Sequence, residues 1–105
     1  MSVVVVIRLR ADAGPEVDAG ARDLLAAFGR RPGFVSGSVA QSIEDDAGTV
    51  LLAHWADLGS WRRALGAPEV KLLATPLLGA AADTVGSYEV VEEAGPGPDP
   101  VRIRR

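Results

Sequence analysis

The stretch from Thr49 to Trp61, TVLLAHWADLGSW, holds the residues best suited to chemistry. It contains the only histidine of the 105-residue chain and both of its tryptophans. Histidine titrates near pH 6.5 and often acts as a general base, whereas tryptophan offers a large flat surface and one N–H donor. His54 is therefore a candidate proton acceptor, and Trp55 and Trp61 are a candidate wall for a planar ligand. The alternative is that both tryptophans fill the core between a sheet and helices.

The period of a strand bears on the role of His54. Residues 49–55 are predicted to form a strand, in which successive side chains point to opposite faces of the sheet. His54 then points away from Trp55 and shares a face with Leu52 and Val50. This direction favours an interface histidine over a catalytic base, and both interpretations stay open. A metal site built on His54 is not expected, because no second histidine is available as a ligand.

Other polar side chains give further candidates. Tyr88 is the second candidate catalytic residue, because its hydroxyl can donate to a substrate oxygen, although a tyrosine on a last strand also suits the edge of a core. Alternation over the predicted strand 34–43 puts Ser36 and Ser38 on one face with Phe34. This face is mostly small, so a bulky group can lie against it.

Composition limits the class of protein. The net charge of −3 and the pI near 5.0 argue against a nucleic-acid partner. The chain has no cysteine, which excludes disulfides and thiolate metal sites. The apolar run at the N-terminus meets arginine too early for a signal peptide or a membrane span. We therefore expect a cytoplasmic protein without a membrane partner.

Hydrophobic periodicity and breakers predict seven elements in one domain. Their order is strand, helix, strand, strand, two helices and strand, which is the βαββαβ pattern of ferredoxin-like α+β folds, with helices on one face of a four-stranded antiparallel sheet. Pro76 is expected to kink or end the second of the paired helices. The predicted elements are strand 3–9, helix 15–29, strand 34–43, an acidic loop 44–48, strand 49–55, a helix capped by Asp57 and closed by Gly66, a helix from Pro68, and strand 84–92.

The sequences of two predicted strands indicate that the sheet packs against a protein partner. Residues 3–9 and 49–55 are apolar on both faces, yet helices in this pattern cover only one face. Packing of the second face against another copy is the simplest solution, so we expect a homodimer with facing sheets. The domain is predicted to span residues 1–93, and residues 94–105, rich in proline and glycine, to form a flexible or partner-swapped tail.

Several of these segments together resemble a known family. They are RPGFVSGS at 31–38, the acidic loop after it, VLLAHWADLGSW at 50–61, and YEVV at 88–91. They resemble the antibiotic biosynthesis monooxygenase family of dimeric α+β barrels, and the likeness extends from Val3 to Val91. The resemblance implies a small pocket between the sheet and the helices of each protomer.

The resemblance also implies which residues contact a ligand. In cofactor-free oxygenases of polyketide pathways, an asparagine, the tryptophan four residues later, a helical aromatic and an arginine contact a polycyclic phenol. The two aromatic positions match Trp55 and Trp61, whereas the asparagine position is Leu51 and the arginine position falls near Ala74. Haem degradation is not expected, because the haem-degrading relatives need an asparagine and this chain has none. The predicted substrate-binding residues are Trp55, Trp61, Leu51, Ser36, Ser38 and Leu73.

These observations lead to one expected function and two alternatives. The resemblance implies a monooxygenase of secondary metabolism that needs no metal, flavin or haem and uses O2 on a planar aromatic polyketide or phenol. The first alternative is a non-oxidative cyclase or isomerase of the same fold. The second is a non-catalytic dimer that binds a small molecule.

Overall fold

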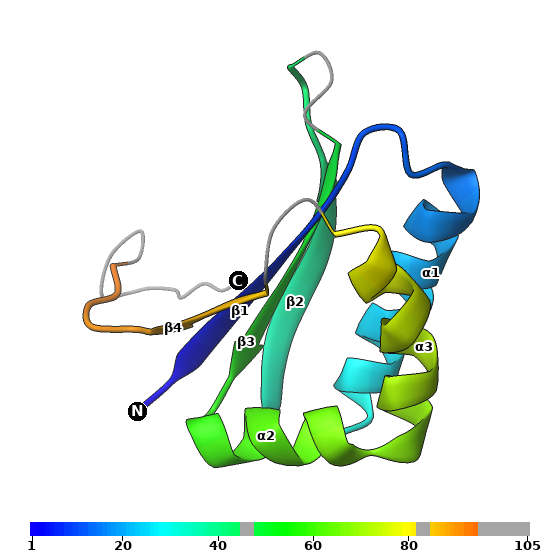
Figure 1. Cartoon of the computed structure of the whole chain (residues 1–105). Helices are drawn as coiled ribbons and strands as arrows, with labels where there is room; N and C mark the ends of the chain where they lie inside the picture. The colour runs from blue at the N-terminus through cyan, green and yellow to red at the C-terminus, as the bar shows by residue number, and fades with distance from the viewer. Residues whose placement is uncertain (45–47, 82–84, 95–105) are drawn as a thin grey trace.

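The computed structural model describes residues 1–44, 48–81 and 85–94 (Figure 1). Most of the predicted acidic loop and all but the first residue of the predicted tail lie outside these ranges, and so does Thr84. The elements are β1 (Val3–Leu9), α1 (Pro15–Gly29), β2 (Phe34–Gln41), β3 (Thr49–Trp55), α2 (Leu58–Gly66), α3 (Pro68–Gly79) and β4 (Gly86–Glu89).

The four strands form one antiparallel sheet in the order β2-β3-β1-β4. The helices lie on one side of this sheet (Figure 1). α1 and α3 pack against each other, and α2 lies at the lower end of the molecule in this view. This arrangement is the predicted ferredoxin-like α+β fold. Its consequence for function is that the sheet has an inner face toward the helices and an outer face without them.

Alternation along the two central strands separates the faces. Inner-face residues are buried, whereas outer-face residues are partly or largely exposed. The register places Val4 opposite His54 and Val6 opposite Leu52 on the outer face, so the predicted direction of His54 is confirmed. Each fully buried aliphatic side chain stabilises the fold by about 1.5–3 kcal/mol. The inner-face residues are Val3, Val5, Ile7 and Leu9 of β1, and Thr49, Leu51, Ala53 and Trp55 of β3.

A bulge near the start of β2 changes the predicted faces of that strand. Phe34 pairs with Trp55, but Ser36 pairs with the next residue of β3, His54, so one extra residue is inserted between them. Phe34 therefore packs on the inner face against Trp55. The prediction that Phe34 shares a face with Ser36 and Ser38 is wrong, because the bulge shifts the alternation by one residue.

The helices begin where the sequence predicts, and one of them ends later. The Asp57 carboxylate accepts a hydrogen bond of 2.7 Å from the Ser60 amide and caps α2. The sequence left open whether Pro76 kinks or ends the helix, and α3 continues past it to Gly79, so the helix does not end at this proline. Pro76 and Leu72, whose carbonyl loses its helical partner to the proline, both lie on the exposed side of α3. Water can therefore solvate that carbonyl, which lets the helix continue.

The last strand is shorter than predicted. β4 pairs only with residues 3–6 of β1, and a further hydrogen bond of 2.9 Å joins the Val90 amide to the Ser2 carbonyl. β1 begins at Val3, so the chain after Glu89 has no further strand residues to pair with. The predicted strand to residue 92 thus ends three residues early.

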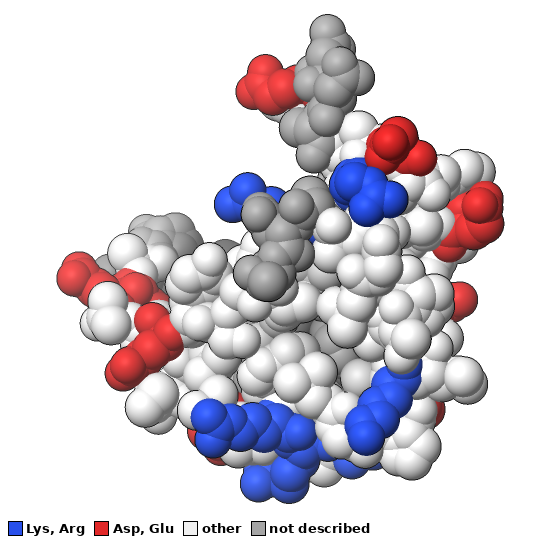
Figure 2. All heavy atoms as spheres, viewed as in Figure 1, with Lys and Arg blue, Asp and Glu red and all other residues white. Residues whose placement is uncertain are grey.

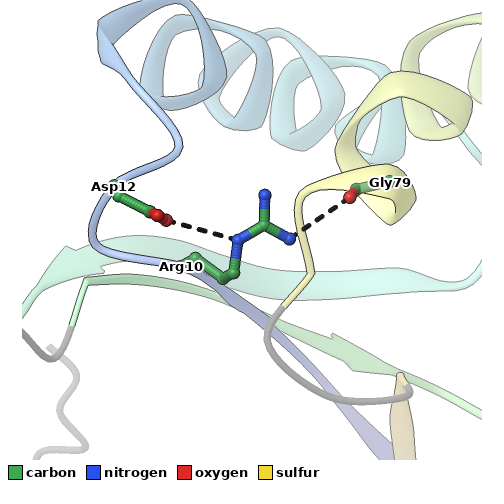
Figure 3. A network of polar contacts seen from close by, with 3 residues as sticks. All are labelled: Arg10, Asp12 and Gly79. Atoms are coloured by element: carbon green, nitrogen blue, oxygen red, sulfur yellow. Dashed lines mark hydrogen bonds and ion pairs between the residues drawn. The ribbon is translucent and has the colours of Figure 1, made fainter.

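Arg10 joins the end of α3 to the end of β1 (Figure 3). Its guanidinium donates to the Gly79 carbonyl at 3.4 Å and to the Asp12 carboxylate at 3.3 Å. Its amide donates to the Ala80 carbonyl at 3.1 Å. Carbonyls at a helix C-terminus have no helical partners, so these bonds satisfy two of them and fix α3 against the sheet.

Within the described ranges, no helix has the length and apolar character needed to cross a membrane. The same ranges contain no group of three or more histidine, cysteine, aspartate or glutamate residues placed to hold a metal ion.

The cap at Asp57 predicts a pH dependence of stability. The hydrogen bond from the Ser60 amide holds the pKa of Asp57 below its ordinary value of 3.8. A carboxyl with a lowered folded-state pKa stabilises the fold above its unfolded pKa, and this contribution is lost as the pH falls through the folded pKa. Asn is also a good cap but has no charge. The free-energy difference between wild type and Asp57→Asn should therefore shrink on acidification from pH 7 to pH 3.

Urea unfolding across this pH range measures that difference. Asp23→Asn, on the exposed side of α1, is the control for loss of one negative charge. A difference for Asp57→Asn that stays constant with pH would show that the charged cap contributes nothing.

Candidate functional site

A cavity of about 300 Å³ lies between the inner face of the sheet and the helices. The sheet contributes its floor through β1 and β4, and all three helices contribute walls. Its lining residues are Ile7, Leu24, Phe28, Trp61, Leu65, Ala74, Leu78, Val85 and Ser87. The predicted pocket between sheet and helices is therefore present in this chain.

The cavity opens to solvent beside two leucines. Leu65 of α2 and Leu78 of α3 line it and are also 41% and 47% exposed. A ligand that covers these two side chains removes apolar surface from water, which favours binding at this place. Trp61 lies deeper, since it is 4% exposed and still lines the cavity. A flat ligand entering between the leucines thus reaches the Trp61 indole.

Trp55 has a different role from Trp61. It is completely buried and is not among the lining residues. Its ring contacts Phe28 and Phe34, each edge-on at a centroid distance of 5.4 Å, and Trp61 at 5.6 Å. Its indole Nε1 has no hydrogen-bond partner among the described residues. Trp55 therefore supports the wall of the cavity from behind and does not form its surface.

The two candidate catalytic residues lie on the outer face. The register aligns Tyr88, Val4, His54 and Ser36 in one row across the four strands. His54 and Tyr88 thus share a face with each other, and the sheet separates both of them from the cavity. The Tyr88 ring folds back over Gly86 of its own strand, where an added Cβ would lie 2.7 Å from the hydroxyl.

The two candidate serines also lie outside the cavity. Ser36 and Ser38 line a shallow outer-face depression of about 160 Å³, together with His54 and Leu52. The bulge in β2 keeps Phe34 inside and both serines outside. The structure therefore groups the serines with His54 and not with Trp61.

The remaining candidates lie near the cavity without lining it. Leu51 is buried on the inner face of β3, and Leu73 packs partly buried against the core from α3. Of the predicted substrate-binding residues, Trp61 is the one that lines the described cavity. Ala74, named above only as the place where a polar contact is missing, does line it.

The sequence contained a signal for some of the lining residues that were not predicted. Leu24 and Phe28 belong to the apolar stripe of α1, and their spacing of four residues puts both on the side that meets the sheet. Nothing in that stripe indicates that these two border open space, because a packed core gives the same pattern. Leu78 and Ser87 are lining residues only because of how α3 and β4 are placed.

The chemistry of the lining is almost wholly apolar. Among the described lining residues, Ser87 alone has a polar side chain, and none is ionisable. Such a surface can bind and orient a planar hydrocarbon framework and exclude water from it. The part of this lining that the structure describes has no set of ligands for a metal ion and no charged group for a phosphate-bearing cofactor.

Comparisons with known proteins agree with this geometry. Residues 1–74 match the family described as "Antibiotic biosynthesis monooxygenase". Among solved structures, the chain is similar to SnoaB, a cofactor-independent oxygenase from Streptomyces nogalater. One SnoaB structure has 28% identity and a TM-score of 0.77, covering 88% of this chain and 95% of that one. A second has 27% identity and a TM-score of 0.76, covering 91% and 98%.

A more distant likeness concerns the fold alone. Rv0793 from Mycobacterium tuberculosis has 17% identity and a TM-score of 0.71, covering 90% of this chain and 97% of its own. A comparison with curated proteins found no match.

The different positions of the two tryptophans predict different effects of truncation. Trp55→Ala should lower the free energy of unfolding by about 3–5 kcal/mol, because it removes a fully buried ring from a packed cluster. Trp61→Ala should cost less, because one side of that ring already borders open space. Urea unfolding of the two variants gives the comparison, and a larger loss for Trp61→Ala would contradict this assignment of roles.

Proposed function

The chain belongs to the antibiotic biosynthesis monooxygenase family, and we propose that it is a cofactor-independent monooxygenase acting on a planar aromatic polyketide or phenol in secondary metabolism. The apolar cavity with Trp61 in its wall is the observation that carries this proposal. The similarity to a cofactor-independent oxygenase supports it.

The size and surface of the cavity suit a compact flat ligand. Small-molecule sites measure roughly 300–1,000 Å³ and are mostly apolar, with a few polar groups that fix orientation. At about 300 Å³ this cavity lies at the small end of the range, which favours two or three fused rings. Trp61 offers a face or an edge for stacking, and the Ser87 hydroxyl offers one hydrogen bond.

The proposed reaction needs no external electron donor. A hydroxyanthrone loses a proton, and the resulting anion transfers an electron to O2. The ring carbon then gains one oxygen atom as a carbonyl, and its two hydrogens leave with the other oxygen as water. The substrate supplies all the electrons, so the protein has to bind it, hold it beside O2 and keep water away.

The route of the proton follows from the lining. His54 and Tyr88 were the candidate acceptors, and both lie on the other side of the sheet from the cavity. We propose instead that the acidic substrate loses its proton to water at the opening, between Leu65 and Leu78. The described lining supplies no general base, so the anion forms at the opening, where water can solvate it.

A non-oxidative function is the second candidate. It is favoured by the lack of any ionisable side chain among the described lining residues, since an oxygenase gains from a group that stabilises the developing anion. A cyclase or isomerase of similar substrates, or a protein that only binds them, needs no O2. The oxygen measurement below separates these possibilities.

We also propose that the chain acts as a homodimer whose sheets pack face to face. The outer face carries a patch of apolar residues on its two central strands, Val4 and Val6 of β1 and Val50 and Leu52 of β3, and no helix covers it. A single sheet with helices on one face leaves this surface to water, and packing against a second copy removes it from water.

Oxygen uptake tests the proposed activity. Purified protein with anthrone in aerated buffer, without metal or flavin, should consume O2 and yield the quinone. Ala74→Phe should lower the rate on the order of tenfold or more, because a ring at this lining position occupies the space of the substrate. Ala19→Phe, on the exposed side of α1, is the matched control and should keep the wild-type rate.

The wild-type result decides among the candidates. Substrate loss without O2 uptake would overturn the oxygenase proposal in favour of a non-oxidative enzyme. Binding of the aromatic molecule without substrate loss and without O2 uptake would indicate a protein that only binds small molecules. An unchanged rate in a folded Ala74→Phe variant would show that the reaction occurs outside this cavity.

A charge on the outer face tests the dimer. Leu52→Glu should convert a dimer to a monomer in sedimentation velocity, because burying a carboxylate between the two sheets carries a large desolvation cost. Leu72→Glu, on the exposed side of α3, adds the same charge and should leave the mass unchanged. A wild-type monomer, or a dimeric Leu52→Glu variant, would contradict the proposed interface.

A further inference from the structure

Among the residues that the structure describes, most of the basic side chains lie at one end of the molecule. Figure 2 shows basic side chains gathered at the lower end of the molecule, where α2 lies, and acidic side chains mainly around the other sides. The acidic residues that the structure describes at this end include Asp57 and Glu69. Its basic residues are Arg30 and Arg31 after α1, Arg62 and Arg63 in α2, and Lys71 in α3.

The basic side chains at this end differ in their partners. Arg30 forms an ion pair with Glu69 at 3.1 Å, and Arg63 donates to the Ser60 hydroxyl at 3.3 Å. Arg62 and Lys71 make no ion pair or side-chain hydrogen bond with any other described residue. These two exposed cations are therefore available for an external anion.

Helical spacing places Arg62 beside the cavity. Residues three or four apart lie on the same side of a helix. In α2, Arg62 precedes the mouth residue Leu65 by three positions and so lies on the Leu65 side of the helix, about 100° round from the lining residue Trp61. Arg63 is turned by about 200° from Trp61, at roughly 100° per residue, and so points away from the cavity.

The same spacing places Lys71 on the other side of the opening. Lys71 precedes the lining residue Ala74 by three positions and the mouth residue Leu78 by seven, all on one stripe of α3. The cavity thus has an apolar interior, two exposed leucines at its mouth, and one unpaired cation on each of the two helices that form the mouth.

We infer that the ligand of this cavity is an aromatic acid, whose rings occupy the apolar interior and whose carboxylate is held at the mouth by Arg62 and Lys71. The inference rests on the proposed function only in taking a planar aromatic molecule as the ligand. Both cations act on binding and orientation, since a carboxylate at the mouth fixes which end of the ring system enters first. They are specificity-determining residues and take no part in proton or electron transfer.

The physical basis is that each part of such a ligand keeps a suitable environment. The rings leave water for an apolar cavity, whereas the carboxylate stays at the solvent-exposed mouth and avoids the cost of burying a charge. Attraction between exposed charges is screened over about 8 Å at physiological salt. The preference for an acid should therefore be strong at low ionic strength and weak at high ionic strength.

Equilibrium dialysis with a matched ligand pair tests the inference. 2-Naphthoate and 2-naphthamide have nearly the same shape, but only the first is charged at pH 7.5. In low salt, the wild-type protein should bind naphthoate about fivefold or more tightly than naphthamide. The double variant Arg62→Gln/Lys71→Gln should lose this preference while its affinity for naphthamide stays the same.

A control variant separates local recognition from overall charge. Arg22→Gln/Arg63→Gln removes the same total charge from positions outside the mouth and should keep the preference for naphthoate. Circular dichroism melting establishes that each variant is folded.

Each outcome gives a definite answer. Equal binding of both ligands by wild type, or a preference that survives in Arg62→Gln/Lys71→Gln, would overturn the inference. Loss of the preference in both double variants would also overturn it, because the effect would then be general electrostatics. If naphthamide still binds tightly in these cases, the proposal that the cavity binds a planar aromatic ligand stands. If neither ligand binds, that proposal is contradicted as well.

Discussion

The structure depends on the contact between Trp55 at the end of β3 and the aromatic rings around it. Phe28 from α1, Phe34 from β2 and Trp61 from α2 all meet this buried indole at centroid distances of 5.4–5.6 Å. Phe28 also meets Trp61 edge-on at 5.6 Å. Edge-to-face aromatic pairs add about 0.5–1.5 kcal/mol each beyond the area they bury. The cluster thus fixes the distance and orientation of two helices relative to the sheet at one end of the molecule.

The cavity exists because this cluster fills only that end. Farther along, α3 faces the sheet with Ala74, a side chain too short to fill the space between the layers. The hydrogen bonds of Arg10 with the Gly79 and Ala80 carbonyls fix the far end of α3 to the end of β1. A well-packed aromatic cluster at one end and a polar anchor at the other therefore leave an apolar space between them, and Phe28 and Trp61 are the rings that belong to both cluster and cavity.

Much of the fold could be predicted because strand and helix periods are local properties. Alternation over residues 3–9 and 49–55 gave the correct faces, including the outward direction of His54. The bulge after Phe34 could not be predicted, because it depends on how β2 fits against its neighbour. For the site, the type of residue was informative for Trp61. Ser36 and Ser38 were predicted to bind substrate, but the structure places them on the outer face, away from the cavity. The open space beside Leu24 and Leu78 is set by the separation of layers, which has no local sequence signal.

The central claim is that the chain inserts one atom of O2 into an aromatic ligand without a cofactor. The most direct test is turnover of anthrone by the purified protein under ¹⁸O₂, with mass spectrometry of the quinone after a single short incubation. The account predicts one ¹⁸O atom in the newly formed carbonyl group and none when the label is supplied in water, after correction for carbonyl exchange. Label arriving from water, or an enzyme-independent rate equal to the catalysed one, would contradict it.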